Sequence, residues 1–205
     1  MPWNAAISTT IEHMPNPLNR VHAVDVPAES AVATVYASTQ LADAFAVRLP
    51  DGATRDPETL ARFILEQQPA WVDGLMQVRD TLVGGLGLKT AKQLRAEGAK
   101  PGAARIGIFR IYETRPHEII VGEEDHHLDF RASVLVRPEP GRAAGEAGGP
   151  QQVVVSTVVH CHNLLGRGYL TLIAPFHRQV VQAGLRRALR SGWPPAAAQA
   201  KGALA

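Results

Sequence analysis

A block of acids and histidines precedes one of the clearest strand patterns in the sequence. The stretch GEEDHHLDFRASVLV (122–136) begins with carboxylate and imidazole groups and ends in the alternating residues of a half-buried strand. A second alternating stretch, QQVVVSTVVHCHN (151–163), also ends in histidines. These residue types can bind a metal ion or transfer protons, so their placement by the fold decides what chemistry they can do.

The alternation predicts how these two strands pair. We expect strands 127–136 and 153–162 to be antiparallel neighbours joined by the polar loop 137–150. Centring the loop near residue 144 gives the pairs Leu128–Cys161, Phe130–Val159, Ala132–Thr157 and Val134–Val155, which keep one face apolar. A slip by one residue would mix the two faces, whereas a slip by two residues would not. The second face then pairs His127 with His162, Asp129 with His160, Arg131 with Val158 and Ser133 with Ser156.

This register predicts that His127, Asp129, His160 and His162 gather at one end of the second face. Three imidazoles and a carboxylate are a suitable ligand set for tetrahedral zinc. The simpler interpretation is a ladder of polar cross-strand pairs on a solvated face, with no metal. We expect the ladder, and the zinc site stays open as the alternative.

Other catalytic patterns have little support. Cys161 falls on the apolar face of the predicted pair, which favours an inert core thiol. Glu113 and Glu118 can sit together at a hairpin, but this spacing alone does not define an acid–base pair. The glycines of GGLGLKTAKQLRAEGAKPGA (84–103) lack the spacing of a phosphate-binding loop, so we expect a flexible connection there.

The composition describes a globular protein without a marked charge. Hydrophobic residues make up 45% and charged residues 20% of the 205 residues, and the formal net charge is +2. This balance does not indicate nucleic-acid binding. The single cysteine excludes an intrachain disulfide, and neither a signal peptide nor a membrane-spanning run is apparent. We therefore expect a cytoplasmic protein.

The remaining elements follow from local signals. Asp56-Pro57-Glu58 predicts the start of a short helix, and Pro69 predicts the start of an amphipathic one. Residues 164–191 predict a long amphipathic helix, kinked near Ala174 because Pro175 lacks a backbone donor. We expect strands at 31–38, 43–50, 105–113, 117–122, 127–136 and 151–163. The expected domains are a loose lead-in at 1–22, one domain at 23–192 and a disordered tail at 193–205.

The order of strands, short helices, antiparallel meander and long C-terminal helix resembles the helix-grip fold of START-like (SRPBCC), polyketide-cyclase-like proteins. The stretches VGEEDHHLDFRASVLV and LLGRGYLTLIAPFHRQVV, with PAWVDGLMQVRDTLV and GLK (87–89), are similar to a bacterial family of unknown function. The resemblance covers roughly 31–190. Its recurring positions here are Gly122, Asp125, His127, Leu128, Asp129, Phe130, Arg131, Gly166, Arg167, Tyr169, Pro175, Phe176 and His177.

The resemblance implies an α+β fold in which a curved antiparallel sheet wraps round the C-terminal helix and leaves a cavity for a small hydrophobic ligand. The residues expected to line it are Trp71, Phe109, Ile111, Tyr112, Tyr169, Phe176 and His177. The alternative is an enzyme of the cyclase, dehydratase or isomerase kind, with His177, Glu113 and Tyr169 as candidate catalytic residues.

The resemblance also bears on partners. Some relatives are similar to domains that follow a nucleotide-binding oxidoreductase domain. This chain shows no preceding domain of that kind, so we expect any redox role to be in trans with an oxidoreductase partner. We expect no cofactor, nucleic acid or membrane span, and a homodimer is possible.

Overall fold

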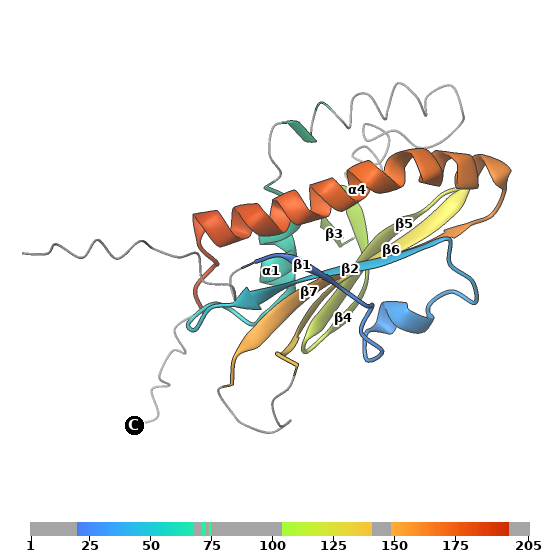
Figure 1. Cartoon of the computed structure of the whole chain (residues 1–205). Helices are drawn as coiled ribbons and strands as arrows, with labels where there is room; N and C mark the ends of the chain where they lie inside the picture. Colours follow the sequence, from blue (N-terminus) through green and yellow to red (C-terminus); the bar gives the residue numbers. More distant parts are fainter. Residues whose placement is uncertain (1–19, 68–70, 73, 75–103, 141–148, 197–205) are drawn as a thin grey trace, which may run out of the picture.

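The computed structural model describes residues 20–67, 71–72, 74, 104–140 and 149–196. These residues form one antiparallel sheet and two α-helices, α1 (Pro57–Leu65) and α4 (Leu164–Ser191), together with a 3-10 helix, η1 (Ala31–Thr34). The strands are β1 (His22–Val24), β2 (Leu41–Leu49), β3 (Arg105–Ile106), β4 (Phe109–Arg115), β5 (Glu118–Glu124), β6 (Leu128–Pro138) and β7 (Gln151–Cys161). Their order across the seven-stranded sheet is β1-β2-β7-β6-β5-β4-β3. Helix α4 crosses one face of this curved sheet (Figure 1), which confirms the expected α+β, helix-grip-like architecture.

The register of β6 and β7 is the predicted one. Leu128 pairs with Cys161, Phe130 with Val159 and Asp129 with His160. The alternation fixes which side chains share a face, because a slip by one residue would place every apolar side chain of β6 on the wrong face. The meander from β4 to β7 is therefore as expected, whereas the single strand predicted at 105–113 is divided into β3 and β4. Strand β2 extends the sheet by pairing with β7 along its whole length.

The main core lies between the sheet and the two α-helices. Leu60 and Ile64 of α1 and Leu185 of α4 are completely buried against the sheet. Asp56 caps α1 by accepting a hydrogen bond from the amide of Thr59, and Pro57 occupies the first turn, as the sequence predicted. These contacts fix α4 over β2 and β7 and leave α1 beside it.

The opposite face of the sheet differs from the expectation. We predicted a solvated surface, but its centre is covered by η1 and the residues that precede it, and Ser133 and Ser156 are completely buried. Figure 1 shows η1 on the side of the sheet away from α4. The prediction was wrong because 25–38 has no periodic pattern that marks it as a cover, and we expected a strand at 31–38 instead of η1.

Two glycines of the predicted motif permit close approach of backbone segments. A Cβ atom at Gly166 would overlap the carbonyl oxygen of His127, and one at Gly122 would overlap that of Phe130. Asn163 caps α4, and its side-chain oxygen accepts a hydrogen bond from the amide of Gly166. The first turn of α4 is thereby pressed against the start of β6.

Helix α4 runs without interruption through Pro175 to Ser191, and Gly192 follows with a positive φ of 81°. The residues after it were expected to be disordered. Residues 193–196 are instead held in place: Trp193 packs on Phe63, and the carbonyl oxygen of Pro194 accepts a hydrogen bond from Thr54. The segments 1–19 and 197–205, and the helix expected from Pro69 beyond residue 74, lie outside the described residues.

Candidate functional site

A histidine and an aspartate meet between α4 and the sheet. His177 lies on the sheet-facing side of α4, and its Nε2 is 3.5 Å from Oδ1 of Asp43 on β2. The other oxygen of Asp43 accepts a hydrogen bond from Nε of Arg178 at 3.2 Å. Only 12% of the Asp43 side chain is exposed, whereas 50% of the Arg178 side chain is. The half-exposed guanidinium of Arg178 therefore holds the Asp43 carboxylate from the solvent side. The imidazole of His177 lies on the buried side of the same carboxylate.

The Nε2 atom of His177 is a buried polar atom whose hydrogen-bonding capacity is not used by the described residues. Nε2 of His177 is buried, and no hydrogen-bond partner is present for it among the described residues. Its approach to Asp43 is close enough for electrostatic attraction but does not have hydrogen-bond geometry. A buried imidazole nitrogen without a partner carries a desolvation penalty, and a polar ligand atom can remove that penalty.

Half-buried apolar side chains occupy the same face of the sheet. Asp43 lies opposite Thr157, which lies opposite Ala132, so one cross-strand row leads from the carboxylate towards the centre of the sheet. In the next row, Phe130 lies opposite Val159, and its ring packs edge-on against Phe109 with the ring centroids 5.6 Å apart. Apolar walls with a few polar anchors are the usual composition of a small-molecule site.

The predicted ligand-lining residues do not all lie on this face. Phe109 and Ile111 pack, partly buried, with the core beneath the helices. Tyr112 lies on the opposite face in the cluster with Val32 and Ile120, because β4 alternates. Trp71 and Phe176 are exposed, and Tyr169 is half-buried. Of the predicted residues, Phe109 and Ile111 thus lie on the helix-facing side of the sheet, and His177 lies on the sheet-facing side of α4.

The third catalytic candidate lies at the surface. Glu113 is exposed, and one of its oxygens is 2.6 Å from Nε of Arg115. It does not pair with Glu118 across the hairpin, because the strand register sets Glu113 opposite Ile120 and Arg115 opposite Glu118. Asp43, which no sequence pattern indicated, is instead the carboxylate beside the candidate catalytic histidine, His177. The only sequence signal of Asp43 is an acidic residue within the mainly apolar strand LADAFAVRL, which also contains Arg48.

The acid and histidine cluster forms on the other face, close to its predicted position. Nε2 of His162 is 3.1 Å from Oδ2 of Asp129, and the rings of His160 and His162 pack edge-on with centroids 5.2 Å apart. Nδ1 of His160 lies 2.8 Å from the carbonyl oxygen of Ser38, so this nitrogen carries the proton. The cluster is a hydrogen-bonded ladder at the end of the sheet.

His127 is not part of this ladder, because its imidazole contacts the residue that caps α4. Its Nδ1 is 3.0 Å from Nδ2 of Asn163, the residue that caps α4. Within the described part of the chain, no three side chains of His, Cys, Asp or Glu are grouped so that they can hold one metal ion. The zinc alternative for His127, Asp129, His160 and His162 stays a prediction without geometric support.

An arginine and two tyrosines extend the ladder. The guanidinium of Arg131 lies 3.4 Å from the ring centre of Tyr112 and donates a hydrogen bond to the hydroxyl of Tyr36 at 3.3 Å. It also pairs with Glu124 at 2.5 Å. Burial raises the pKa of Tyr36 to about 12, although the positive charge of Arg131 acts in the opposite direction. Burial likewise raises the pKa of Tyr112.

Glu118 has a structural role on this face. Only 3% of it is exposed, and Oε1 accepts hydrogen bonds of 2.5 Å from the hydroxyls of Ser30 and Ser133. Oε2 accepts the amide of Ala31 at 3.0 Å. The carboxylate therefore ties the segment before η1 to the sheet, which sequence analysis did not anticipate.

Cys161 is a buried thiol on the helix-facing side, as predicted. It packs with Leu41, Val159 and Leu170. Burial raises its pKa, and the nearby charge of Arg167 lowers it by less. A raised thiol pKa disfavours the nucleophilic thiolate at neutral pH.

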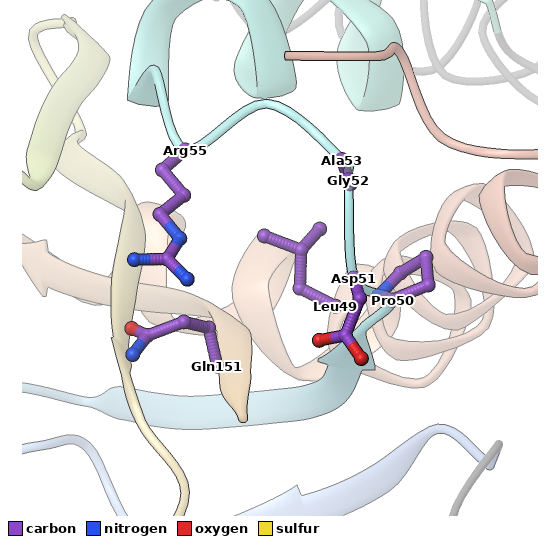
Figure 2. Close-up of a pocket in the computed structure, with 7 residues that line it drawn as sticks. All are labelled: Leu49, Pro50, Asp51, Gly52, Ala53, Arg55 and Gln151. Atoms are coloured by element: carbon purple, nitrogen blue, oxygen red, sulfur yellow. The ribbon is translucent and has the colours of Figure 1, made fainter. Parts of the chain in front are cut away.

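A small cavity of about 260 Å³ lies at the far end of β2. Figure 2 shows Arg55 and Gln151 on one side of it and the carboxylate of Asp51 on the other, with Leu49 and Pro50 beside them. This volume is slightly below the roughly 300 Å³ at which ligand pockets begin. None of the residues predicted to bind a ligand lines it.

The family model described as "Protein of unknown function (DUF2867)" matches residues 35–184. The chain belongs to this family, which confirms the expected membership of a family of unknown function. The matched range includes both Asp43 and His177. No curated protein matches the chain. No solved structure matches it either. In addition, none of the described helices is long and apolar enough to cross a membrane.

Proposed function

We propose that this protein binds a small, mainly apolar molecule between α4 and the sheet, and that His177 and Asp43 hold the polar group of that molecule. The carrying observation is the buried Nε2 of His177, which has no hydrogen-bond partner among the residues that the structure describes and faces the carboxylate of Asp43 at 3.5 Å. A ligand hydroxyl fits this arrangement because it can donate to the carboxylate and accept from the imidazole.

The apolar part of the ligand would lie against the half-buried side chains on the same face. Phe109, Phe130 and Ile111 are only partly buried there, although they adjoin completely buried core residues. Covering their remaining exposed surface would contribute about 25 cal/mol for each Å² removed from water. The polar pair would then provide orientation and selectivity rather than most of the affinity.

Native mass spectrometry of protein purified without denaturation tests this proposal. We expect an additional small-molecule mass that is released on unfolding. His177→Leu should lower its occupancy about tenfold, because loss of one hydrogen bond in a buried site costs roughly 1–3 kcal/mol. His117→Leu, an exposed histidine at the β4–β5 turn, is the matched control. An absent adduct, or equal occupancy in both variants, contradicts the proposal.

A second candidate function is acid–base catalysis by the same pair. A carboxylate beside an imidazole orients the ring and stabilises its protonated form, which is the usual support of a general base. The observation that favours it is the position of the Asp43 carboxylate, which lies 3.5 Å from Nε2 of His177 with only 12% of its side chain exposed. In this case Asp43→Asn would abolish turnover of the bound compound and leave its occupancy within about twofold of wild type. An unchanged compound in the purified protein, recovered equally from wild type and Asp43→Asn, counts against catalysis.

The resemblance suggested a third role, as an accessory domain of a nucleotide-dependent oxidoreductase. The contacts of Asp43 and His177 do not bear on it, and it stays a prediction.

A further inference from the structure

We infer that the cavity at the end of β2 is a binding site for a small zwitterion, a molecule whose ammonium and carboxylate groups are joined by a short hydrocarbon chain. The cavity has a volume of about 260 Å³ and lies beside the loop that connects β2 to α1. Figure 2 shows the guanidinium of Arg55 and the amide of Gln151 on one side and the carboxylate of Asp51 on the other. Neither Asp43 nor His177 lines this cavity, so the inference is independent of the proposed ligand site.

The loop that carries both charges is held by its own turn and by the C-terminal segment. The loop turns at Gly52, whose positive φ of 81° is the conformation that glycine adopts most readily. The amide of Thr54 donates to the carbonyl oxygen of Pro194 at 2.8 Å. The amide of Ala196 donates to the carbonyl oxygen of Gly52 at the same distance of 2.8 Å. The backbone beside the cavity is therefore fixed, and a ligand does not have to order it on binding.

The two charges beside the cavity select a ligand that carries both signs. Arg55 and Asp51 form no ion pair with each other or with any other residue that the structure describes. An anion at Arg55 would meet the negative charge of Asp51, and a cation at Asp51 would meet the positive charge of Arg55, whereas a zwitterion pairs with both. Nε2 of Gln151 donates one N–H to the carbonyl oxygen of Gly149 at 3.3 Å. Its second N–H can donate to a carboxylate beside Arg55.

The size and the apolar part of the cavity define the rest of the ligand. Leu49 and Pro50 lie beside the two charged groups (Figure 2), where they can contact a hydrocarbon chain that joins the ammonium to the carboxylate. A volume of about 260 Å³ corresponds to roughly nine water molecules at about 30 Å³ each. This limits the ligand to about ten non-hydrogen atoms or fewer. The ligand class is therefore an amino acid with a short apolar chain.

Amino acids of increasing charge separation test the inference with the full chain. The probes are glycine, β-alanine and 4-aminobutyrate, and the singly charged controls are butyrate and butylamine. Binding is followed by NMR titration of the backbone amides of Gly52 and Ala53. Because both charged side chains are exposed, we expect the best zwitterion to bind with a dissociation constant on the order of 1–10 mM, at least about threefold more tightly than either control. If no probe shifts these amides, or if a singly charged control binds as tightly as the best zwitterion, the inference is wrong.

Charge variants locate the two ends of the ligand. Asp51→Asn and Arg55→Gln should each weaken binding of the best zwitterion at least about threefold, with unchanged circular dichroism, because each removes one of its two ion pairs. Arg110→Gln and Glu113→Gln are the matched controls, since both residues are exposed on β4, which three strands separate from β2. These controls should bind the zwitterion as wild type does. A loss in the controls as large as in the cavity variants would indicate non-specific attraction and overturn the inference. A loss in only one of the two cavity variants would also overturn it, because the site then binds a single charge.

Discussion

At the scale of single residues, two buried polar groups differ in whether they make hydrogen bonds. Glu118 accepts hydrogen bonds from two hydroxyls and one amide, so its burial is compensated. Nε2 of His177 is also buried but has no such partner in the described part of the chain. A group of the first kind stabilises a fold, whereas a group of the second kind requires an explanation, and a ligand atom that bonds to it is one.

Tyr36 makes a testable contribution to stability at high pH. Its folded-state pKa is raised to about 12, mainly by burial, whereas an unfolded tyrosine ionises near 10. Between these values the unfolded chain loses a proton that the folded chain keeps, so stability falls as the pH rises. We expect the melting temperature of wild type to fall more steeply than that of Tyr36→Phe between pH 10 and 12. Parallel curves for the two proteins would show that the phenol is not held neutral by the fold.

At the scale of elements, the attachment of α4 to β6 depends on one residue without a side chain. A Cβ atom at Gly166 would overlap the carbonyl oxygen of His127, and the cap made by Asn163 leaves the helix start little room to move. Gly168, one half-turn later, is exposed and has open space where a Cβ would be. A Cβ atom is therefore excluded at Gly166 but can be accommodated at Gly168.

Alanine at these two positions should have opposite effects. Gly166→Ala should destabilise the protein by roughly 2 kcal/mol or more, because the helix start must shift away from β6. Gly168→Ala should stabilise it by up to about 1 kcal/mol, since alanine is the better helix former. Urea unfolding measures both, and a neutral Gly166→Ala would mean that α4 does not press on His127.

The segment that covers the second face depends on Glu118. Glu118→Gln replaces one carboxylate oxygen, a hydrogen-bond acceptor, by an NH2 group, which is a donor. The hydroxyls of Ser30 and Ser133 and the amide of Ala31 are donors to this carboxylate, so the change should lower the free energy of unfolding by about 1–3 kcal/mol. Glu113→Gln, on the same hairpin but exposed, should change stability by less than about 0.5 kcal/mol. Hydrogen exchange at Ala31 should quicken only in the first variant. If Ala31 exchanges equally in both, the carboxylate does not hold the segment.

At the scale of the whole molecule, local patterns predicted the elements and long-range packing decided the site. The alternation of β6 and β7, together with a loop centred near residue 144, predicted that Leu128 faces Cys161, because a slip by one residue would mix the two faces. The pairing of Asp43 with His177 could not be predicted in this way. It requires that β2 lie beside β7 and that α4 cross both, and no local pattern encodes either arrangement.

The dependence on long-range packing also explains why the predictions for residues 31–38 and for Trp193 differ from the structure. Residues 31–38 are rich in strand-forming types, yet tertiary contacts of Val32 with Ile120 and Val158 determine their structure. Trp193 was assigned to a tail because prolines follow it, but its ring packs on Phe63. In both cases the partner is distant in the sequence, so the contact has no periodic signature.

The most direct test of the proposed site is an experimental structure of the protein purified without denaturation. Our account predicts a small molecule with one polar atom within hydrogen-bond distance of Nε2 of His177 and its apolar part against Phe109 and Phe130. A structure in which His177 bonds directly to Asp43, and in which the side chains of α4 and the sheet fill the space between them, would contradict it.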